Sequence, residues 1–144
     1  MLIMALLMQL TARADTPDRI HGFRIGVCGG FSTECVGVAP KIEYAGRRMG
    51  INLSTALAYS AVSVRAYPLP EPTDTPVRWR PYVYGGGSLI LFAGAFVGGG
   101  VGADIHLLQS RRLCLQPSLG IQHMPHYTYP ETFPAGSLGV MYTF

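Results

Sequence analysis

The chain has 144 residues, enough for one domain and too few for two. Charged residues make up 13% of it, about half the usual share, while 49% of its residues are hydrophobic, which excludes a disordered chain. The net charge is +3, and only Arg47-Arg48 and Arg111-Arg112 are adjacent basic pairs. A nucleic-acid partner is therefore not expected.

The first fourteen residues are an apolar run that ends in Ala12-x-Ala14, a pattern that signal peptidase cleaves. We therefore predict a signal peptide over residues 1–14 and one mature domain over residues 15–144. No basic residue precedes the apolar run, which suggests a true start codon farther upstream. Export agrees with the three cysteines, because an oxidising compartment allows one disulfide and leaves one thiol.

From Asp15 onward, hydrophobic residues recur with a period of two rather than the 3.6 of a helix. The first three segments, residues 20–28, 35–45 and 49–59, each have one apolar face and one face of small or polar residues. If neighbouring strands place their small or polar faces on the same side of the sheet, Cys28 pairs with Cys35 across a six-residue loop, and Arg24 then pairs with Ala39. The same arrangement also places Glu43 opposite Asn52 across an Arg47-Arg48 turn.

A fourth strand is expected near residues 60–67, with Ser60-Ala61 as the turn before it, and a proline-rich segment over residues 68–76 ends it. Further strands are expected over residues 77–90, 95–107 and 113–122. A loop over residues 123–134 then leads to a last strand over residues 136–144. The count is eight strands, give or take two.

The composition of the two faces indicates where the apolar one points. In a soluble barrel the outward face would be rich in Lys and Glu, whereas here the second face is mostly Gly, Ala and Ser with isolated charges. The segments also have the roughly 9 to 11 residues that a membrane-crossing strand needs. The pattern predicts an all-β fold, a single antiparallel transmembrane β-barrel of about eight strands that is inserted as a monomer.

Two other folds remain open. One is a soluble barrel that binds a small ligand. The other is a membrane-spanning helix over residues 81–103, which carry no charge; eight glycines among these 23 residues disfavour it, because each costs a helix about 1 kcal/mol relative to alanine.

In the last strand Leu138, Val140, Tyr142 and Phe144 share one face. This arrangement resembles the C-terminal β-signal of bacterial outer-membrane proteins. Residues 80–87, Arg-Pro-Tyr-Val-Tyr-Gly-Gly-Gly, are similar to the Pro-Tyr-x-x-Gly strands of OmpA-like and OmpX-like barrels. The resemblance implies an outer-membrane location with lipid as partner, recognition by the outer-membrane assembly machinery, and a periplasmic C-terminus. It names an architecture and not an activity.

Charged and titratable residues on the predicted inner face should pair with opposite charges, because an unpaired charge there would be costly. They are Arg24, Lys41, Glu43, Arg65, Arg78, Arg80, Asp104 and His106. An eight-stranded barrel leaves no room for an open pore, so these residues are interpreted as a polar plug in a structural or surface-interaction protein.

The cysteines and the last loop hold the remaining candidate sites. A disulfide is expected between Cys28 and Cys35, with two unpaired thiols as the alternative; Cys114 would then be an interior packing residue. No metal site and no cofactor are predicted.

The loop contains His126, Thr128 and Glu131, residue types of a hydrolase triad. It is similar to the His-x-Ser and acidic partner of outer-membrane lipid A deacylases, with threonine in place of serine. A lipid A-modifying hydrolase is therefore the alternative function, although an aromatic girdle or contact surface without catalysis is expected here.

Overall fold

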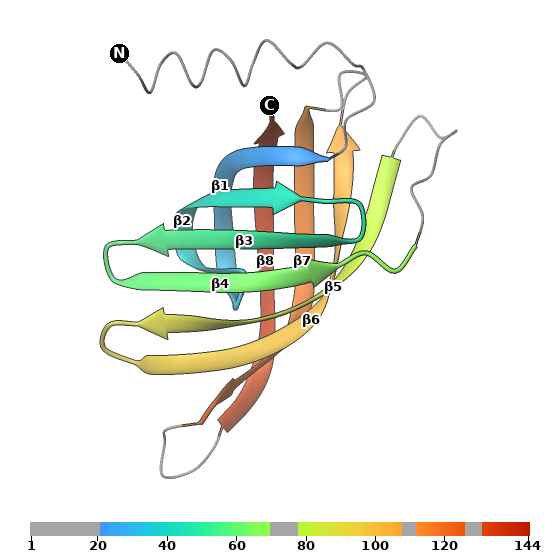
Figure 1. Cartoon of the computed structure of the whole chain (residues 1–144). Coiled ribbons are helices and arrows are strands. Elements are labelled where there is room, and N and C mark those ends of the chain that lie inside the picture. Colours follow the sequence, from blue (N-terminus) through green and yellow to red (C-terminus); the bar gives the residue numbers. More distant parts are fainter. Residues whose placement is uncertain (1–20, 70–77, 108–111, 126–130) are drawn as a thin grey trace, which may run out of the picture.

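The computed structural model describes residues 21–69, 78–107, 112–125 and 131–144. Within these ranges eight strands form a closed antiparallel barrel, in which each strand pairs with its sequence neighbours and β1 pairs with β8 (Figure 1). The strands are β1 (Gly22–Ser32), β2 (Cys35–Ala45), β3 (Met49–Ala56), β4 (Tyr59–Ala66), β5 (Arg78–Ile90), β6 (Gly94–Leu107), β7 (Leu113–Met124) and β8 (Glu131–Thr143). The predicted all-β barrel of about eight strands is confirmed. Residues 1–14, the predicted signal peptide, lie outside the described residues.

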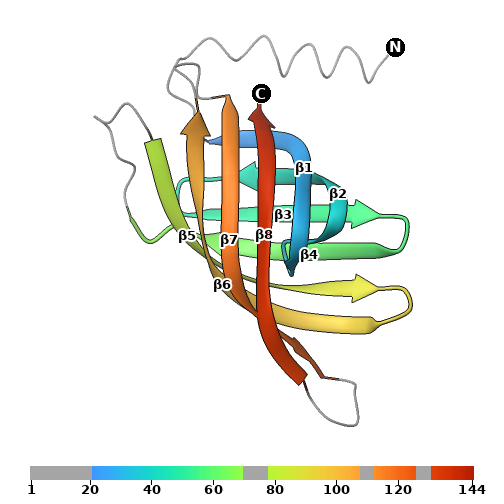
Figure 2. The same cartoon turned by 180° about the vertical axis from the view of Figure 1, so that it is seen from behind.

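The turns alternate between two ends of the barrel, because neighbouring strands are antiparallel (Figure 2). We call the end that holds the start of β1, the β2–β3 turn and the end of β8 the near end, and the opposite one the far end. Arg78 of β5 has a partner on β6, which has a partner on β7, and so on around the barrel. This series of partners returns to β5 at Ser88, so the stagger of the barrel is ten residues. This stagger tilts the strands, as the closure of a barrel requires.

Side chains alternate between the lumen and the outer wall along the strands. On β8, Leu138, Val140 and Tyr142 are exposed on the wall while Met141 and Thr143 are buried. The other strands also place apolar side chains outside and polar side chains inside, which is the reverse of the distribution in a soluble protein.

The first hairpin differs from its predicted register by four residues. Cys28 pairs with Ala39, not Cys35, and Ser32 pairs with Cys35 across a two-residue turn. A shift of four keeps every side chain on its face, so alternation alone could not distinguish the two registers. Pairing continues past the expected loop because the hairpin bends at Gly30 and Gly37, which are paired and have φ angles of 142° and 68°. Glycine adopts this conformation without strain.

The turn between β3 and β4 is three residues earlier than predicted. Ala56 pairs with Tyr59 across Leu57 and Ala58, so the Tyr59 side chain points into the lumen instead of outward. Inside, its hydroxyl accepts a hydrogen bond from the Val36 amide at 2.6 Å and bonds the Ser54 hydroxyl at 2.8 Å. These bonds favour the inward position, and no glycine or proline marks the turn in the sequence.

The last hairpin is longer than predicted, with β7 reaching Met124 and β8 beginning at Glu131. This places Phe133 in a strand rather than a loop. Its ring lies 5.5 Å from that of Phe31 and 6.1 Å from that of Phe96, measured between centroids. The packing of these rings accounts for the extension.

The single-helix hypothesis for residues 81–103 is wrong, because this segment forms most of the β5–β6 hairpin. Its glycines leave space for inward rings: a Cβ on Gly102 would lie 2.5 Å from the ring of Tyr82. The described chain holds no helix long and apolar enough to cross a membrane.

Candidate functional site

The tip of the β1–β2 hairpin is folded into the barrel, and Glu34 at this tip is fully buried. Its carboxylate pairs with Arg65 of β4 and accepts hydrogen bonds of 3.0 Å from the Tyr82 hydroxyl and the Asn52 amide. The Ser54 hydroxyl donates to the Glu34 carbonyl at 2.9 Å. Since β3, β4 and β5 all supply these partners, the tip is held inside the lumen rather than over its rim.

A network of ion pairs continues from this tip toward the near end. Arg65 also pairs with Glu43 at 2.8 Å and with Asp104 at 3.4 Å. Arg24 bridges the same two carboxylates, at 3.0 Å from Glu43 and 2.7 Å from Asp104. The Gln116 amide donates to both at 2.9 and 3.1 Å. Each carboxylate is thus compensated by an arginine, as buried charge requires.

Tyr67 and Arg80 close the network at the near end. The Tyr67 hydroxyl donates to Asp104 at 3.1 Å, and the guanidinium of Arg80 lies 3.5 Å from the centroid of the Tyr67 ring. Burial, with the nearby Asp104 and Glu43 carboxylates, raises the pKa of Tyr67, which lies just beyond β4. The phenol therefore keeps its proton and acts as a donor.

Apolar groups fill the far end of the lumen. A disulfide joins Cys28 to Cys35, with Cα atoms 6.0 Å apart, and packs against Ala39, Tyr59 and Ala61. It links the inserted tip back to the straight part of β1. The ring of Phe96 is buried and contacts the rings of Phe31, which is 37% exposed, and of the partly buried Phe133, with centroids 5.5 to 6.1 Å apart. The lumen is therefore occupied at the far end by the hairpin itself, with these rings at its edge.

One group of side chains has the composition of a metal site. Asp104, His106 and Cys114 are buried, and their ligand atoms lie within 4.8 Å of one another. Both oxygens of Asp104, however, already accept hydrogen bonds from Arg24, Arg65 and other donors. A cation would have to displace these arginines and sit beside their charge, so the arrangement favours packing over metal binding.

The predicted plug residues all lie in the lumen, where Arg24, Lys41, Glu43, Arg65, Arg80, Asp104 and His106 are buried and Arg78 is partly buried. The structure brings Arg24, Glu43 and Asp104 into direct contact, whereas Arg80 bonds to backbone carbonyls of the β2–β3 turn. Sequence reasoning missed Glu34, which stood in an expected loop and carried no signal of its burial. It also missed Tyr67, Tyr82 and Gln116 as partners.

The hydrolase hypothesis has one of its three residues in the described part of the chain. His126 and Thr128 lie outside the described residues. Glu131 is exposed at the start of β8.

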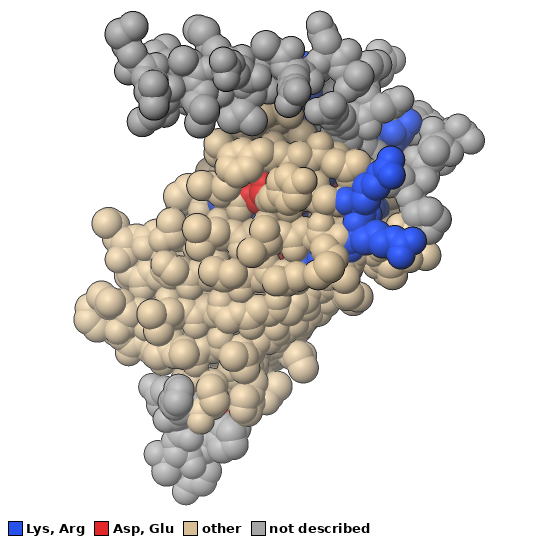
Figure 3. All heavy atoms as spheres, viewed as in Figure 1, with Lys and Arg blue, Asp and Glu red and all other residues tan. Residues whose placement is uncertain are grey.

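The outer wall carries no Lys, Arg, Asp or Glu at the outward positions of the described strands. Figure 3 shows this wall with almost no charged atoms, while basic atoms gather at one side over the β2–β3 turn. Aliphatic side chains cover its middle. Most exposed aromatic residues of the described chain lie at the near end, where they are Phe23, Tyr44, Trp79, Tyr142 and Phe144, whereas Phe31 and Phe92 are exposed at the far end.

Comparison with known proteins gives no match: no protein family, no curated protein and no solved structure is significantly similar to the chain. Its function is therefore inferred from its own geometry.

Proposed function

We propose that this chain is an integral β-barrel of the bacterial outer membrane, with a closed lumen and a structural or surface-interaction role. The observation that carries the proposal is the inverted distribution of polarity around a closed barrel. Three carboxylates and their arginine partners are buried inside, while exposed Ile, Leu and Val cover the outside.

The outer wall supports the membrane location. Soluble monomers rarely expose contiguous apolar patches larger than a few hundred Å². Here the apolar side chains continue from strand to strand, as in Ile25, Ile42 and Leu53, which are paired across β1, β2 and β3. A continuous apolar wall of this kind is stable against the hydrocarbon chains of lipid, whereas its exposure to water would be unfavourable.

The aromatic residues at the near end support the same location. Trp and Tyr favour the boundary between hydrocarbon and headgroups, and Tyr44, Trp79 and Tyr142 are exposed there. We place the near end on the periplasmic side, because the last strand ends there and its resemblance to the assembly signal implies a periplasmic C-terminus. Leu138, Val140, Tyr142 and Phe144, which resemble the assembly signal, form one exposed row that the assembly machinery could contact.

The contents of the lumen support a closed barrel rather than a channel or a ligand-binding cup. Glu34, Arg65 and Tyr82 are fully buried inside it, and the inserted hairpin tip occupies space that a ligand would need. An eight-stranded barrel is just wide enough to be filled by its own side chains or to hold one small ligand, and here the hairpin tip and the ion-pair network take up that space.

The test is electrophoretic mobility of the refolded protein in detergent with and without heating. A closed barrel is expected to run faster when unheated, and the protein should fractionate with outer membranes. Equal mobility together with recovery in the soluble periplasmic fraction would reject the proposal. In planar bilayers the protein should give no steady single-channel conductance, and a regular conductance would reject the closed lumen.

A further inference from the structure

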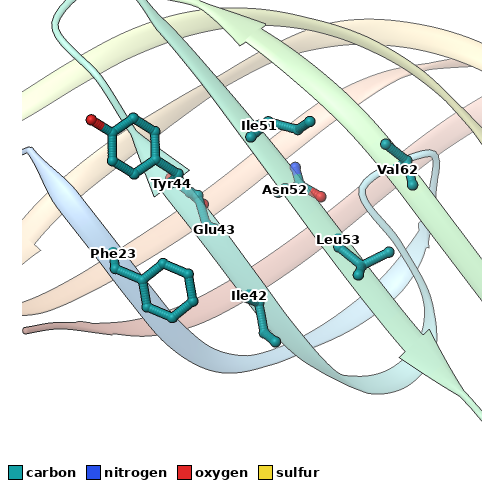
Figure 4. A pocket seen from close by; sticks show the side chains of 8 residues that line it. All are labelled: Phe23, Ile42, Glu43, Tyr44, Ile51, Asn52, Leu53 and Val62. Carbon is teal, nitrogen blue, oxygen red and sulfur yellow. The ribbon is translucent and has the colours of Figure 1, made fainter. Parts of the chain in front are cut away.

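A shallow apolar groove lies on the outer wall between side chains of β1 to β4 (Figure 4). Glu43 and Asn52 also border it, but their side chains are buried on the lumen side and are held by the internal network. The exposed lining is therefore apolar and suits a hydrocarbon chain better than a polar ligand. Its members are Phe23, Ile42, Tyr44, Ile51, Leu53 and Val62.

The groove leads to two exposed arginines. Tyr44 and Ile51, at the end of the groove nearer the turn, are paired one step before Ala45 and Gly50, the last pair ahead of the β2–β3 turn that carries Arg47 and Arg48. Within the part of the chain that the structure describes, neither arginine forms an ion pair with a carboxylate. The turn thus offers two positive charges at one end of an apolar groove.

The backbone of this turn is fixed from inside the barrel. Arg80 donates to the carbonyl of Gly46 at 3.0 Å and to that of Arg47, and the Tyr67 amide donates to the carbonyl of Arg48 at 2.8 Å. The turn is closed by the Gly46 amide, which donates to the Met49 carbonyl at 2.8 Å. Because all three turn carbonyls are engaged, the two arginine side chains leave a rigid backbone, which lowers the entropy lost when they bind a ligand.

We infer that the groove and the turn together bind one anionic phospholipid, with an acyl chain along the groove and the phosphate at Arg47 and Arg48. Leu53 is five residues beyond Arg48, or about 17 Å along the strand at roughly 3.4 Å per residue. Because barrel strands tilt by about 35–45°, this length spans about 12–14 Å of membrane depth, so a chain that reaches Leu53 covers most of the way from the headgroups to the centre of the ~30 Å hydrocarbon core. The inference rests on the proposed function and on a periplasmic near end, where the leaflet is phospholipid.

The test is native mass spectrometry of the purified full chain in a neutral detergent, with equimolar phosphatidylglycerol and phosphatidylcholine of identical acyl chains. The wild type is expected to retain phosphatidylglycerol about tenfold better, because two interfacial arginines attract the anionic headgroup. The variant R47Q/R48Q should lose this preference. R112Q is the matched control, since it removes another exposed charge at the near end and should keep the preference. Leu53→Trp fills the groove and should reduce retention of both lipids.

Equal retention of the two lipids by the wild type, or a preference that survives R47Q/R48Q, would overturn the lipid site. Stronger retention of purified lipid A than of phosphatidylglycerol would overturn the assignment to a phospholipid. Heat-dependent mobility on the same samples separates this inference from the proposed function. A loss of preference in a variant that keeps its mobility shift is the expected result, whereas a wild type without any shift counts against the membrane barrel itself.

Discussion

Glu34, in the turn between β1 and β2, is ion-paired inside the lumen with Arg65, which lies 31 residues later on β4. The pair joins the inserted hairpin tip to the barrel wall. Arg65 also contacts Glu43 and Asp104, which Arg24 pairs with as well, so within the described chain Glu34 is the carboxylate of the three that depends on Arg65 alone among the arginines.

Replacing Arg65 with methionine should therefore destabilise the barrel strongly. The change leaves Glu34 without its arginine in the interior, and breaking a buried pair in this way typically costs about 3–5 kcal/mol. The measurement is the urea midpoint for loss of the heat-dependent mobility shift in lipid vesicles. The exposed Arg48→Gln is the control and should shift the midpoint little. An R65M midpoint equal to the wild type would show that the tip is not held by this pair.

Removing the disulfide with Cys28→Ser and Cys35→Ser should lower stability by about 2–3 kcal/mol, because the bond restricts a short loop of the unfolded chain. Reductant should lower the wild-type midpoint by the same amount and leave the double variant unchanged. Cys114→Ser serves as the control, because Cys114 is the free and buried cysteine of the described chain. Maleimide labelling of the denatured, unreduced protein should find one thiol; three would contradict the bond.

The faces of the strands could be predicted because alternation is a local property. Each of Arg24, Glu43 and Asp104 is inward for the simple reason that its neighbours along the strand are apolar. The predicted pairing of Glu43 with Asn52 is confirmed as well, since the Arg47-Arg48 turn leaves little freedom in register.

The positions of the turns, and of the side chains near them, could not be predicted in the same way. The burial of Glu34 depends on a bend at Gly30 and Gly37 and on partners from β4 and β5, none of which is a neighbour in sequence. The inward turn of Tyr59 likewise depends on the amide of Val36. Contacts between distant segments decided these features, and a period of two does not encode them.

Trp79, the single tryptophan, reports on the environment of the near end. It is exposed on the outer wall at the start of β5, so it should sit at the level of the headgroups. In vesicles with brominated lipids, bromine close to the headgroup should quench its fluorescence more than bromine near the chain ends. Moving the fluorophore to mid-wall with Trp79→Phe and Leu119→Trp should reverse that order. A soluble barrel predicts no quenching at either depth.

A charge placed on the middle of the outer wall should be costly in proportion to its depth. Val101 is exposed on β6, paired with Val83 and Leu119, and far from either end of these strands. Val101→Arg should destabilise the barrel in vesicles by about 2–4 kcal/mol, since arginine at the bilayer midplane loses its hydration. Leu57→Arg, in the β3–β4 turn, is the matched control and should cost about 0–1 kcal/mol because the rim lies near water. Urea midpoints in the same vesicles give both values. If the two variants lost equal stability, the middle of the wall would not face hydrocarbon.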